Sequence, residues 1–521
     1  MQLRKEVTMR LKLNSVFWIS AIIVTLVVII GAVIPKTFAN VANAALDFTT
    51  SSFGWLFLAA VFLFVVFLIY LVFSKYGKIR LGGEDERPEF PLFSWIGMLF
   101  SCGFGIALVF YGIGEPMSHF FTPPYKDVEP LTTESARLAM GYSFFHYGVS
   151  QWAIFSIVGL AMAYFQFRKK ENGLVSTTLS PIIGKGRHEK PTKKFIDILA
   201  ITATIMGVAT SLGLGIMQID GGIRFSYNMP DASWIKIVIV IVMMALFLTS
   251  AITGINKGMK WLSTFNLFAV FLIMLFIFIT GPTQFILDTF IVGISDYISN
   301  FVTYSLRLNP YNGNPWVYKW TIFYWAWAIA WSPFVGSFIA RVSRGRTIRE
   351  FIIGVMVAPP VIALVWIAIF GGTALHMDLF EGTEIAAAVN DDITSALFTM
   401  LQGLPISGVV TVFVLILILT FLVTSVDSAV FILSSMSTNG SLNPPIFVRV
   451  IWGVLMGAIA LVLLLSSGLT GLQSASVVSA LPFTIILLLI MVAFYKTMRK
   501  DLKLAPKPAS AKKRSVIRRK R

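Results

Sequence analysis

The chain has 521 residues, of which 56% are hydrophobic and only 13% are charged, and its formal net charge is +17. Apolar segments of about 20 residues recur along it, the length needed to cross a bilayer core, so the composition indicates a polytopic membrane protein. The single cysteine, Cys102, excludes an intramolecular disulfide. The positive charge lies mostly in loops between apolar segments, which argues against a nucleic-acid-binding protein.

Twelve transmembrane helices are predicted. They lie near 16–34, 53–73, 92–112, 139–164, 195–218, 234–253, 261–281, 318–340, 352–372, 408–434, 446–468 and 475–495. Most of the 42 lysines and arginines fall in alternate connecting segments, namely 1–15, 74–91, 165–194, 254–260, 341–351, 435–449 and 496–521. Because basic residues concentrate in cytoplasmic loops, both termini are predicted to be cytoplasmic, which requires an even number of spans.

Some segments are not expected to span the membrane. Residues 284–305 and 391–402 have apolar positions at helical spacing with polar ones between, which is typical of extracellular surface helices. The tail KLAPKPASAKKRSVIRRKR is too polar to pack in a core and basic enough to bind anionic membrane lipids, either as an anchor or as a sensor.

The predicted organisation has six parts. They are a cytoplasmic N-terminus (1–15), two N-terminal helices and a linker (16–91), a first repeat (92–281), an extracellular loop with a surface helix (282–315), a second repeat (316–497) and a basic tail (498–521).

The segment WTIFYWAWAIAWSPFVGSFIARVS, in the eighth predicted span, is the densest in aromatic residues. At about 100° per residue, five rings share one helix face: Tyr324, Trp327, Trp331, Phe334 and Phe338. Ring faces attract cations. Pro333 lacks an N–H and is expected to interrupt the helix, freeing nearby carbonyl groups for a ligand. The alternative, a proline kink in a packed helix with aromatic filler, remains open.

The third predicted span contains a second interruption. Gly103 and Gly105 allow the helix to unwind there at a low cost in conformational free energy. This span begins on the cytoplasmic side and the eighth begins outside, so the two interrupted helices are five spans apart and run in opposite directions. Such a pattern predicts inverted five-helix repeats, spans three to seven and eight to twelve, with the binding site at their interface. Glycines that only permit close helix packing are the alternative.

Polar side chains in the tenth span suggest a cation site. Within two helical turns it carries Phe421, Thr424, Ser425, Asp427 and Ser428. Sodium, a hard cation, prefers hydroxyl and carbonyl oxygens. Serine and threonine in a helix also bond back to their own backbone, so a structural role stays open for each. A carboxylate inside a membrane, as at Asp427, is costly unless it is paired or solvated.

Enzymatic motifs are missing from the sequence. His188-Glu189 is not followed by a histidine at 192, so no HExxH zinc motif exists, and no Walker sequence is present. We therefore predict a protein that is not an enzyme, needs no cofactor and is driven by ion gradients.

Three segments carry a resemblance to a known family. FYWAWAIAWSPFVGSFIARVSRGRTIREF, GFGIALVFYGIGEP and TSVDS resemble hallmark segments of the betaine/choline/carnitine transporter (BCCT) family, and the likeness covers residues 15 to 497. It implies an all-α fold similar to the sodium/amino-acid symporter LeuT, with two extra N-terminal helices before the 5+5 inverted repeats. It also implies quaternary ammonium or zwitterionic substrates, a role in osmotic stress, and frequently a homotrimer in the cell membrane.

The resemblance implies a set of substrate-binding residues. The family's aromatic box falls on Tyr147, Trp152, Phe155 and Ala328, the pathway continues through Trp327, Trp331 and Phe334, and Gly103 and Gly105 form the unwound segment. The commonest betaine carriers have tryptophan at 147 and 328 and tyrosine at 155, so this box has weaker cation–π capacity. The gap at Ala328 must be filled by a neighbouring ring or a bulkier substrate, such as the cyclic zwitterion ectoine.

The resemblance also implies sodium ligands. One site would use main-chain oxygens of Ser101 and Phe104 together with Phe421, Thr424 and Ser425. A second site would need hydroxyls in the fifth span, where Thr204 is present but Val208 stands one turn later. One sodium site is therefore better supported than two.

The resulting hypothesis is a sodium-coupled importer of a compatible solute, glycine betaine or a related zwitterion, working by alternating access. Within the family, the alternative is a proton-coupled or sodium-independent carrier of carnitine, choline or ectoine. Outside it, the alternatives are a channel, or a membrane sensor whose tail is the output.

Overall fold

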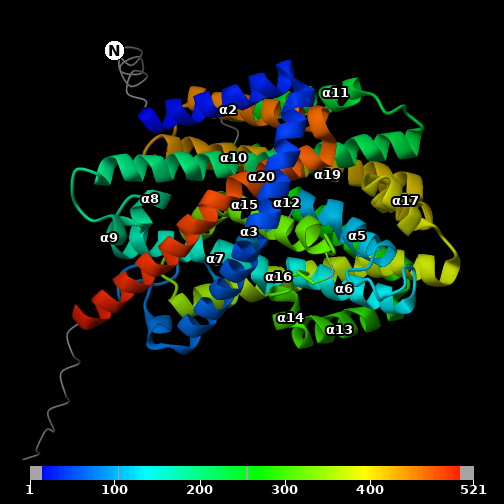
Figure 1. The fold of residues 1–521 in the computed structure, drawn as a ribbon, viewed down its shortest axis with the longest axis horizontal. Coiled ribbons are helices and arrows are strands. Elements are labelled where there is room, and N and C mark those ends of the chain that lie inside the picture. The colour runs from blue at the N-terminus through cyan, green and yellow to red at the C-terminus, as the bar shows by residue number, and fades with distance from the viewer. Residues whose placement is uncertain (1–13, 104, 254–255, 312, 505–521) are drawn as a thin grey trace, which may run out of the picture.

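The computed structural model describes residues 14–103, 105–253, 256–311 and 313–504, which form one bundle of helices (Figure 1). Ten helices in these ranges are long and apolar enough to cross a membrane. The long elements are α2 (Ser15–Val33), α3 (Pro35–Phe73), α6 (Thr133–Tyr147), α7 (Val149–Ala163), α10 (Glu189–Tyr227), α11 (Ser233–Thr253), α12 (Asn256–Thr280), α13 (Thr283–Ser299), α15 (Phe323–Val342), α16 (Ile348–His376), α19 (Ser407–Ser437) and α20 (Ile446–Leu504).

The predicted spans map onto helices with a few changed boundaries. The last two, 446–468 and 475–495, are joined in the single element α20, which is kinked at Gly468, where φ is 57°. Glycine adopts this left-handed conformation without the strain a side chain would add. The second span begins earlier than expected, since α3 starts at Pro35 directly after α2.

The third predicted span is interrupted where its glycines indicated. Helix α4 (Leu92–Gly103) ends and α5 (Ile106–Phe121) begins three residues later, with Gly105 in an extended conformation before the first turn. No side chain caps the start of α5. Its first N–H groups therefore lack a side-chain acceptor from the capping residue, as expected of a discontinuous helix at a binding site.

Ring contacts define how α5 and α15 run relative to each other. Tyr111, near the start of α5, contacts Tyr324 and Trp327, whereas His119, near its end, contacts Trp316 and Trp320. As the residue number rises along α5, that of its ring partners falls along α15 and the residues that lead into it, so the two helices are antiparallel, as the sequence predicted for the third and eighth spans.

Helix α15 is the most enclosed element of the bundle. It packs along α7, α10 and α20, and all of its residues are buried except Ser337, Phe338 and Arg341. The expected interruption at Pro333 is wrong, because α15 continues through this proline. The Ser332 hydroxyl donates to the Ile329 carbonyl at 2.8 Å, so a side chain bonds a carbonyl one turn before the proline.

The outer helices expose apolar side chains where a lipid-facing surface is expected. Large exposed residues on α2, α3 and α12 include Trp18, Ile22, Phe73, Phe268 and Phe271. Their number would be unusual on a soluble monomer and agrees with the membrane location that the composition indicated.

The two predicted surface helices differ from expectation. Residues 284–305 form α13 and the short α14 (Phe301–Ser305), separated at Asn300, and α13 packs against α6 and α16. Residues 391–402 form a 3₁₀ turn, η5 (Ile393–Ser395), followed by α18 (Ala396–Gln402). Five of the seven residues of α18 are buried. This segment is therefore wrongly predicted as a surface helix: its apolar face is covered by the bundle.

Two loops are bound together beyond the end of α15. The Leu81 N–H donates to the Arg346 carbonyl and the Gly345 N–H to the Leu81 carbonyl, both at 2.8 Å. The Arg346 guanidinium lies 4.0 Å from the centroid of the Trp95 ring. The loop between α3 and α4 is thereby fixed against the one between α15 and α16.

An ion pair reinforces this contact. Arg344 Nε donates to Glu86 at 2.5 Å. The backbone N–H of Gly83, and then Arg344, hold the pKa of the Glu86 carboxyl below its usual range.

The described ends of the chain lie on one side of the molecule. In Figure 1, α2 begins and α20 ends on the left, where the short helices α8 (Val175–Thr178) and α9 (Ser180–Ile183) also lie. Residues 498–504, which we assigned to the basic tail, extend α20, and Asp501 accepts hydrogen bonds from Tyr164 and Lys169. The rest of the tail and residues 1–13 lie outside the described ranges.

Candidate functional site

The break between α4 and α5 faces helix α19. A Cβ placed on Gly105 would lie 3.6 Å from the Phe421 ring and 3.8 Å from the Ser425 hydroxyl. These two predicted sodium ligands therefore lie beside the unwound segment. The side chain of Ser101 and all of Phe104 lie outside what the structure describes.

Thr424 occupies a different environment from Ser425. Its hydroxyl donates to the carbonyls of Thr420 and Phe421, at 3.1 and 3.0 Å, and accepts from the Asn266 side chain on α12 at 3.3 Å. Asn266 also accepts from the Thr420 hydroxyl at 2.6 Å. Sequence reasoning missed Asn266, although an asparagine inside an apolar span was a visible signal.

Two other polar residues have structural partners. The buried Thr204 hydroxyl donates to the Ala200 carbonyl of its own helix at 2.7 Å. This is the usual hydrogen bond of a helical threonine to the carbonyl four residues earlier. Asp427 accepts from Arg449 at 3.2 Å, so the carboxylate that looked costly in the membrane is paired.

The predicted aromatic residues come together along α15. The centroids of Trp327 and Trp331 are 6.4 Å apart and those of Trp331 and Phe334 5.7 Å apart, while Tyr324 lies 6.2 Å from Trp327. We call these four rings the aromatic ladder. Each is less than 10% exposed, so the ladder is an internal feature of the bundle.

Helices α6 and α7 add the remaining predicted rings. Phe155 lies 6.2 Å from Trp331 and 5.5 Å from Trp152, and Tyr147 lies 5.5 Å from Tyr324. These distances suit edge-to-face ring packing. Phe155 and Tyr147 therefore pack directly against the ladder, and Trp152 packs against Phe155.

Ala328 is located by the packing of α7 against α15. Phe145, near the end of α6, contacts Trp325, and Phe155 of α7 contacts Trp331, so this chain segment and α15 run in the same direction. Trp152 and Ala328 each lie three residues before the members of the second pair, Phe155 and Trp331. The two residues are therefore at the same level along the two helices. Ala328 is 2% exposed, so α15 carries a small side chain at an enclosed position one turn before Trp331.

Two indole N–H groups of the ladder differ in their partners. Trp327 Nε1 donates to the Gly207 carbonyl of α10 at 3.3 Å. Trp331 Nε1 is buried without an acceptor among the described residues. A buried unpaired donor is costly, so Trp331 presents a group that a ligand oxygen would satisfy.

Comparison with known proteins identifies the family of this chain. The family model described as BCCT, betaine/carnitine/choline family transporter, matches residues 15–503. The chain belongs to the BCCT family. Its relatives include an ectoine/hydroxyectoine transporter of Virgibacillus pantothenticus, 56% identical over 94% of this chain and 98% of that protein.

Two other relatives are named for glycine betaine. The glycine betaine transporter OpuD of Bacillus subtilis (strain 168) is 46% identical over 94% of this chain and 95% of its own length. A probable glycine betaine transporter of Desulfitobacterium hafniense is 42% identical over 94% of this chain and 98% of its own. This BCCT protein is thus a multi-pass membrane transporter and not an enzyme.

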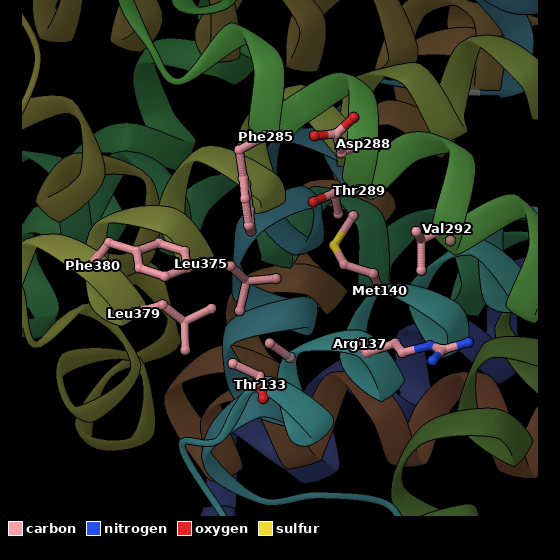
Figure 2. A pocket seen from close by; sticks show the side chains of 12 residues that line it. Thr133, Arg137, Met140, Phe285, Asp288, Thr289, Val292, Leu375, Leu379 and Phe380 are labelled. Atoms are coloured by element: carbon pink, nitrogen blue, oxygen red, sulfur yellow. The ribbon is translucent and has the colours of Figure 1, made fainter.

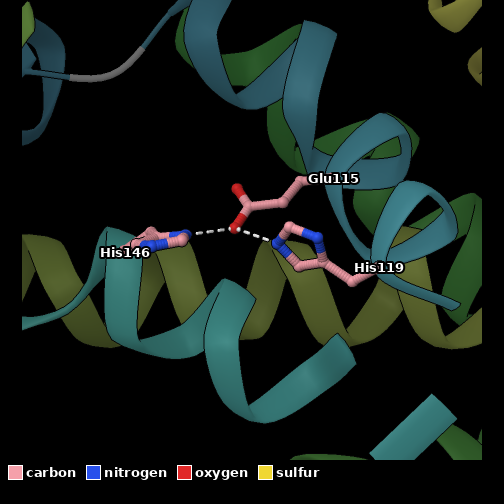
Figure 3. Close-up of side chains that lie close together, drawn as sticks. All are labelled: Glu115, His119 and His146. Atoms are coloured by element: carbon pink, nitrogen blue, oxygen red, sulfur yellow. Dashed lines mark hydrogen bonds and ion pairs between the residues drawn. The ribbon is translucent and has the colours of Figure 1, made fainter. Parts of the chain in front are cut away.

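Next to the ladder the transporter holds a buried cluster that sequence reasoning missed (Figure 3). Glu115 of α5 is bonded through one oxygen to His119 Nε2 at 3.2 Å and to His146 Nδ1 at 2.5 Å. Its other oxygen accepts from the Tyr324 hydroxyl. The acidic residue and both histidines are 0% exposed. The glutamate four residues before a histidine in an apolar segment was the available signal.

A separate cavity of about 240 Å³ lies between α6, α13, the end of α16 and the following turn η4 (Met377–Glu381), as Figure 2 shows. Its walls are largely apolar, with Met140, Leu375 and Leu379 among them, and Arg137 and Asp288 add charge. No ladder residue lines it, so it is not part of the candidate transport site.

Proposed function

We propose that this BCCT transporter imports compatible solutes of the ectoine and glycine betaine type, with sodium as the coupling ion. The observation that carries the substrate class is the missing ring at Ala328, level with Trp152 and beside Trp331. A cyclic zwitterion such as ectoine would occupy the space that a tryptophan fills in the commonest betaine carriers. The ectoine/hydroxyectoine transporter at 56% identity supports this class.

Both solutes carry a cationic group and a carboxylate, and the site has a counterpart for each. Ring faces of Trp152, Phe155 and Trp331 would attract the cation. The unpaired Trp331 N–H would donate to the carboxylate. We expect Trp331→Ala to weaken every substrate, because both contacts are lost, and Trp331→Phe to retain the ring contact while losing the hydrogen bond.

The sodium site would lie at the break between α4 and α5. Ser425 and Phe421 lie beside Gly105, and main-chain oxygens of a discontinuous helix can complete such a site. Thr424 would become a sodium ligand if its hydroxyl released the hydrogen bond with Asn266 and coordinated the ion instead. We propose one sodium site, because Thr204 is bonded to its own helix and Val208 offers no oxygen.

The topology of this proposal has twelve spans, inverted five-helix repeats and cytoplasmic termini. The antiparallel course of α5 and α15 supports the repeats, and the common side of the described ends supports the termini. A trimer, frequent in the family, would be tested by the mass of the purified protein.

The test is uptake of radiolabelled solutes into a strain without its own osmolyte carriers. We expect saturable, sodium-dependent accumulation of ectoine and glycine betaine, with weaker uptake of choline and carnitine. Uptake that does not require sodium would reject the coupling ion. Flux that never saturates would indicate a channel, and absence of accumulation would indicate a sensor.

A further inference from the structure

We propose that Glu115 and His146 share an exchangeable proton, and that its occupancy is linked to binding of the cationic substrate on the aromatic ladder. Carboxylate and histidine groups inside membrane helices often mark ion pathways and proton relays. Here the hydrogen bonds of each histidine determine which protonation states it can adopt.

His119 can adopt only one protonation state without leaving a buried donor unpaired. Its Nε2 bonds Glu115, and its Nδ1 is buried without a partner among the described residues. A proton on Nδ1 would create a buried, unpaired donor, which is costly. His119 is therefore neutral, with the Nε2–H donating to the carboxylate.

His146 can hold two states in the same geometry. Its Nδ1 bonds Glu115 and its Nε2 lies 2.9 Å from the Thr321 hydroxyl. A hydroxyl both donates and accepts, so Thr321 donates to a neutral ring and accepts from a charged one. His146 is the ring of this cluster that can gain and lose a proton without leaving a polar atom unpaired.

The proton changes the charge of the cluster. With His146 charged, the pair with Glu115 is neutral overall; with His146 neutral, one buried negative charge remains. Among the described residues, the other titratable groups near it are tyrosines: Tyr142 and Tyr324 contact His146, and Tyr111 and Tyr147 contact Tyr324. The cation Arg307 stands one layer further out, where it donates to the Tyr142 hydroxyl at 2.6 Å.

Tyr324 connects the cluster to the ladder. Its hydroxyl donates to Glu115, its ring stacks on His146 at 4.7 Å, and its centroid is 6.2 Å from Trp327. A cation on the ladder is attracted by the negative, deprotonated cluster. Substrate binding and proton binding therefore oppose each other, and the coupling is reciprocal.

This linkage rests on the proposed function, because it requires a substrate with a cationic group. Substrate affinity is then expected to rise with pH across the titration of the cluster. One linked proton changes affinity by at most about tenfold per pH unit.

The proton site can be tested without substrate. Trp316 is stacked on His146 at 6.0 Å and lies 4.7 Å from His119, and a charged imidazole quenches a neighbouring indole. We expect the tryptophan emission of the purified protein to show a transition in a pH series from about 5 to 8, the range in which histidine side chains in general change charge. Glu115→Gln and His146→Asn should remove this transition. Glu134→Gln and His188→Asn, matched changes at exposed positions, should preserve it.

Linkage is tested by ligand titrations of the same proteins with ectoine and glycine betaine across that pH range. The expected result is a pH-dependent dissociation constant in the wild type that becomes flat in Glu115→Gln. If that variant does not fold, Thr321→Val serves instead: without the hydroxyl that accepts from the charged ring, the transition should move to lower pH.

An unaltered emission transition in the folded Glu115 and His146 variants, or in Thr321→Val, overturns the proton site. A dissociation constant independent of pH in the wild type overturns the linkage. A pH effect abolished by EDTA would also overturn the proposal, because the same three side chains would then act through a bound metal. Failure of the wild type to bind either solute would instead reject the proposed function, with the proton site still judged by emission.

Discussion

Replacing Ala328 by tryptophan tests the substrate assignment most directly. Ala328 is 2% exposed and about 4.5 Å along the helix axis from Trp331, at 1.5 Å per residue. An indole at this position would restore the ring of the commonest betaine carriers. It would also fill the space that we assign to the ring of ectoine.

The two effects have opposite signs for the two solutes. A ring facing the desolvated ammonium of glycine betaine contributes about 0.5–2 kcal/mol, or about 2- to 30-fold in affinity. Forcing extra atoms into an occupied space costs about 1–3 kcal/mol, or about 5- to 150-fold against ectoine. The preference should therefore shift toward glycine betaine by at least about tenfold.

Competition uptake decides the matter, with labelled glycine betaine displaced by unlabelled ectoine and the reverse. Ala328→Leu is the matched control, since it adds volume without a ring face and should weaken ectoine without improving glycine betaine. An unchanged order of preference in a normally inserted Ala328→Trp protein would show that position 328 does not line the site. Equal gains for both solutes would refute the steric part of the reasoning.

Three further outcomes are expected. Thr424→Ala and Ser425→Ala should each raise the sodium concentration for half-maximal uptake, because a ligand oxygen is lost; unchanged sodium curves would remove both from the site. Deletion of 507–521 should shift the osmolality that activates uptake and leave substrate affinity unaltered, because these basic residues would bind anionic lipid at about 1 kcal/mol each; an identical activation curve would reduce the tail to an anchor. Gly345→Ala should lower the melting temperature, because Gly345 has φ +80° and a Cβ would lie 2.2 Å from the Arg87 carbonyl; unaltered melting would show that the loop adapts.

Much of the fold followed from local patterns in the sequence. Apolar segments of bilayer length predicted the long helices, and Gly103 and Gly105 predicted the interrupted third span, because both signals depend on short stretches of chain. Pro333 misled the prediction for the same reason. Whether a proline interrupts a membrane helix depends on nearby groups that satisfy the freed carbonyls, and α15 is enclosed by three other helices.

The Glu115 cluster could not be predicted because its members come from distant parts of the chain. Glu115 and His119 are one turn apart, but His146 and Tyr324 join them only through the packing of α6 and α15 on α5. Resemblance to a family did not help, since it assigned the ladder and not the residues behind it. The burial of α18 was not predicted for the same reason, because the spacing of apolar residues identifies an apolar helix face and not the element that covers it.

One departure of this transporter from the commonest betaine carriers, Tyr147, makes contacts with both the helix break and Tyr324. The Tyr147 hydroxyl donates to the Ala107 carbonyl at 3.1 Å, in the first turn after the helix break, and lies 3.4 Å from the Tyr324 hydroxyl. A tryptophan at 147 has no hydroxyl to make these contacts. A tyrosine at 147 thus offers a smaller ring to the aromatic box than a tryptophan would. It also contacts both the break in the third span and Tyr324, whose hydroxyl bonds Glu115. Because one residue contacts both, a change in the protonation of the cluster would be transmitted to the unwound segment where sodium is expected to bind.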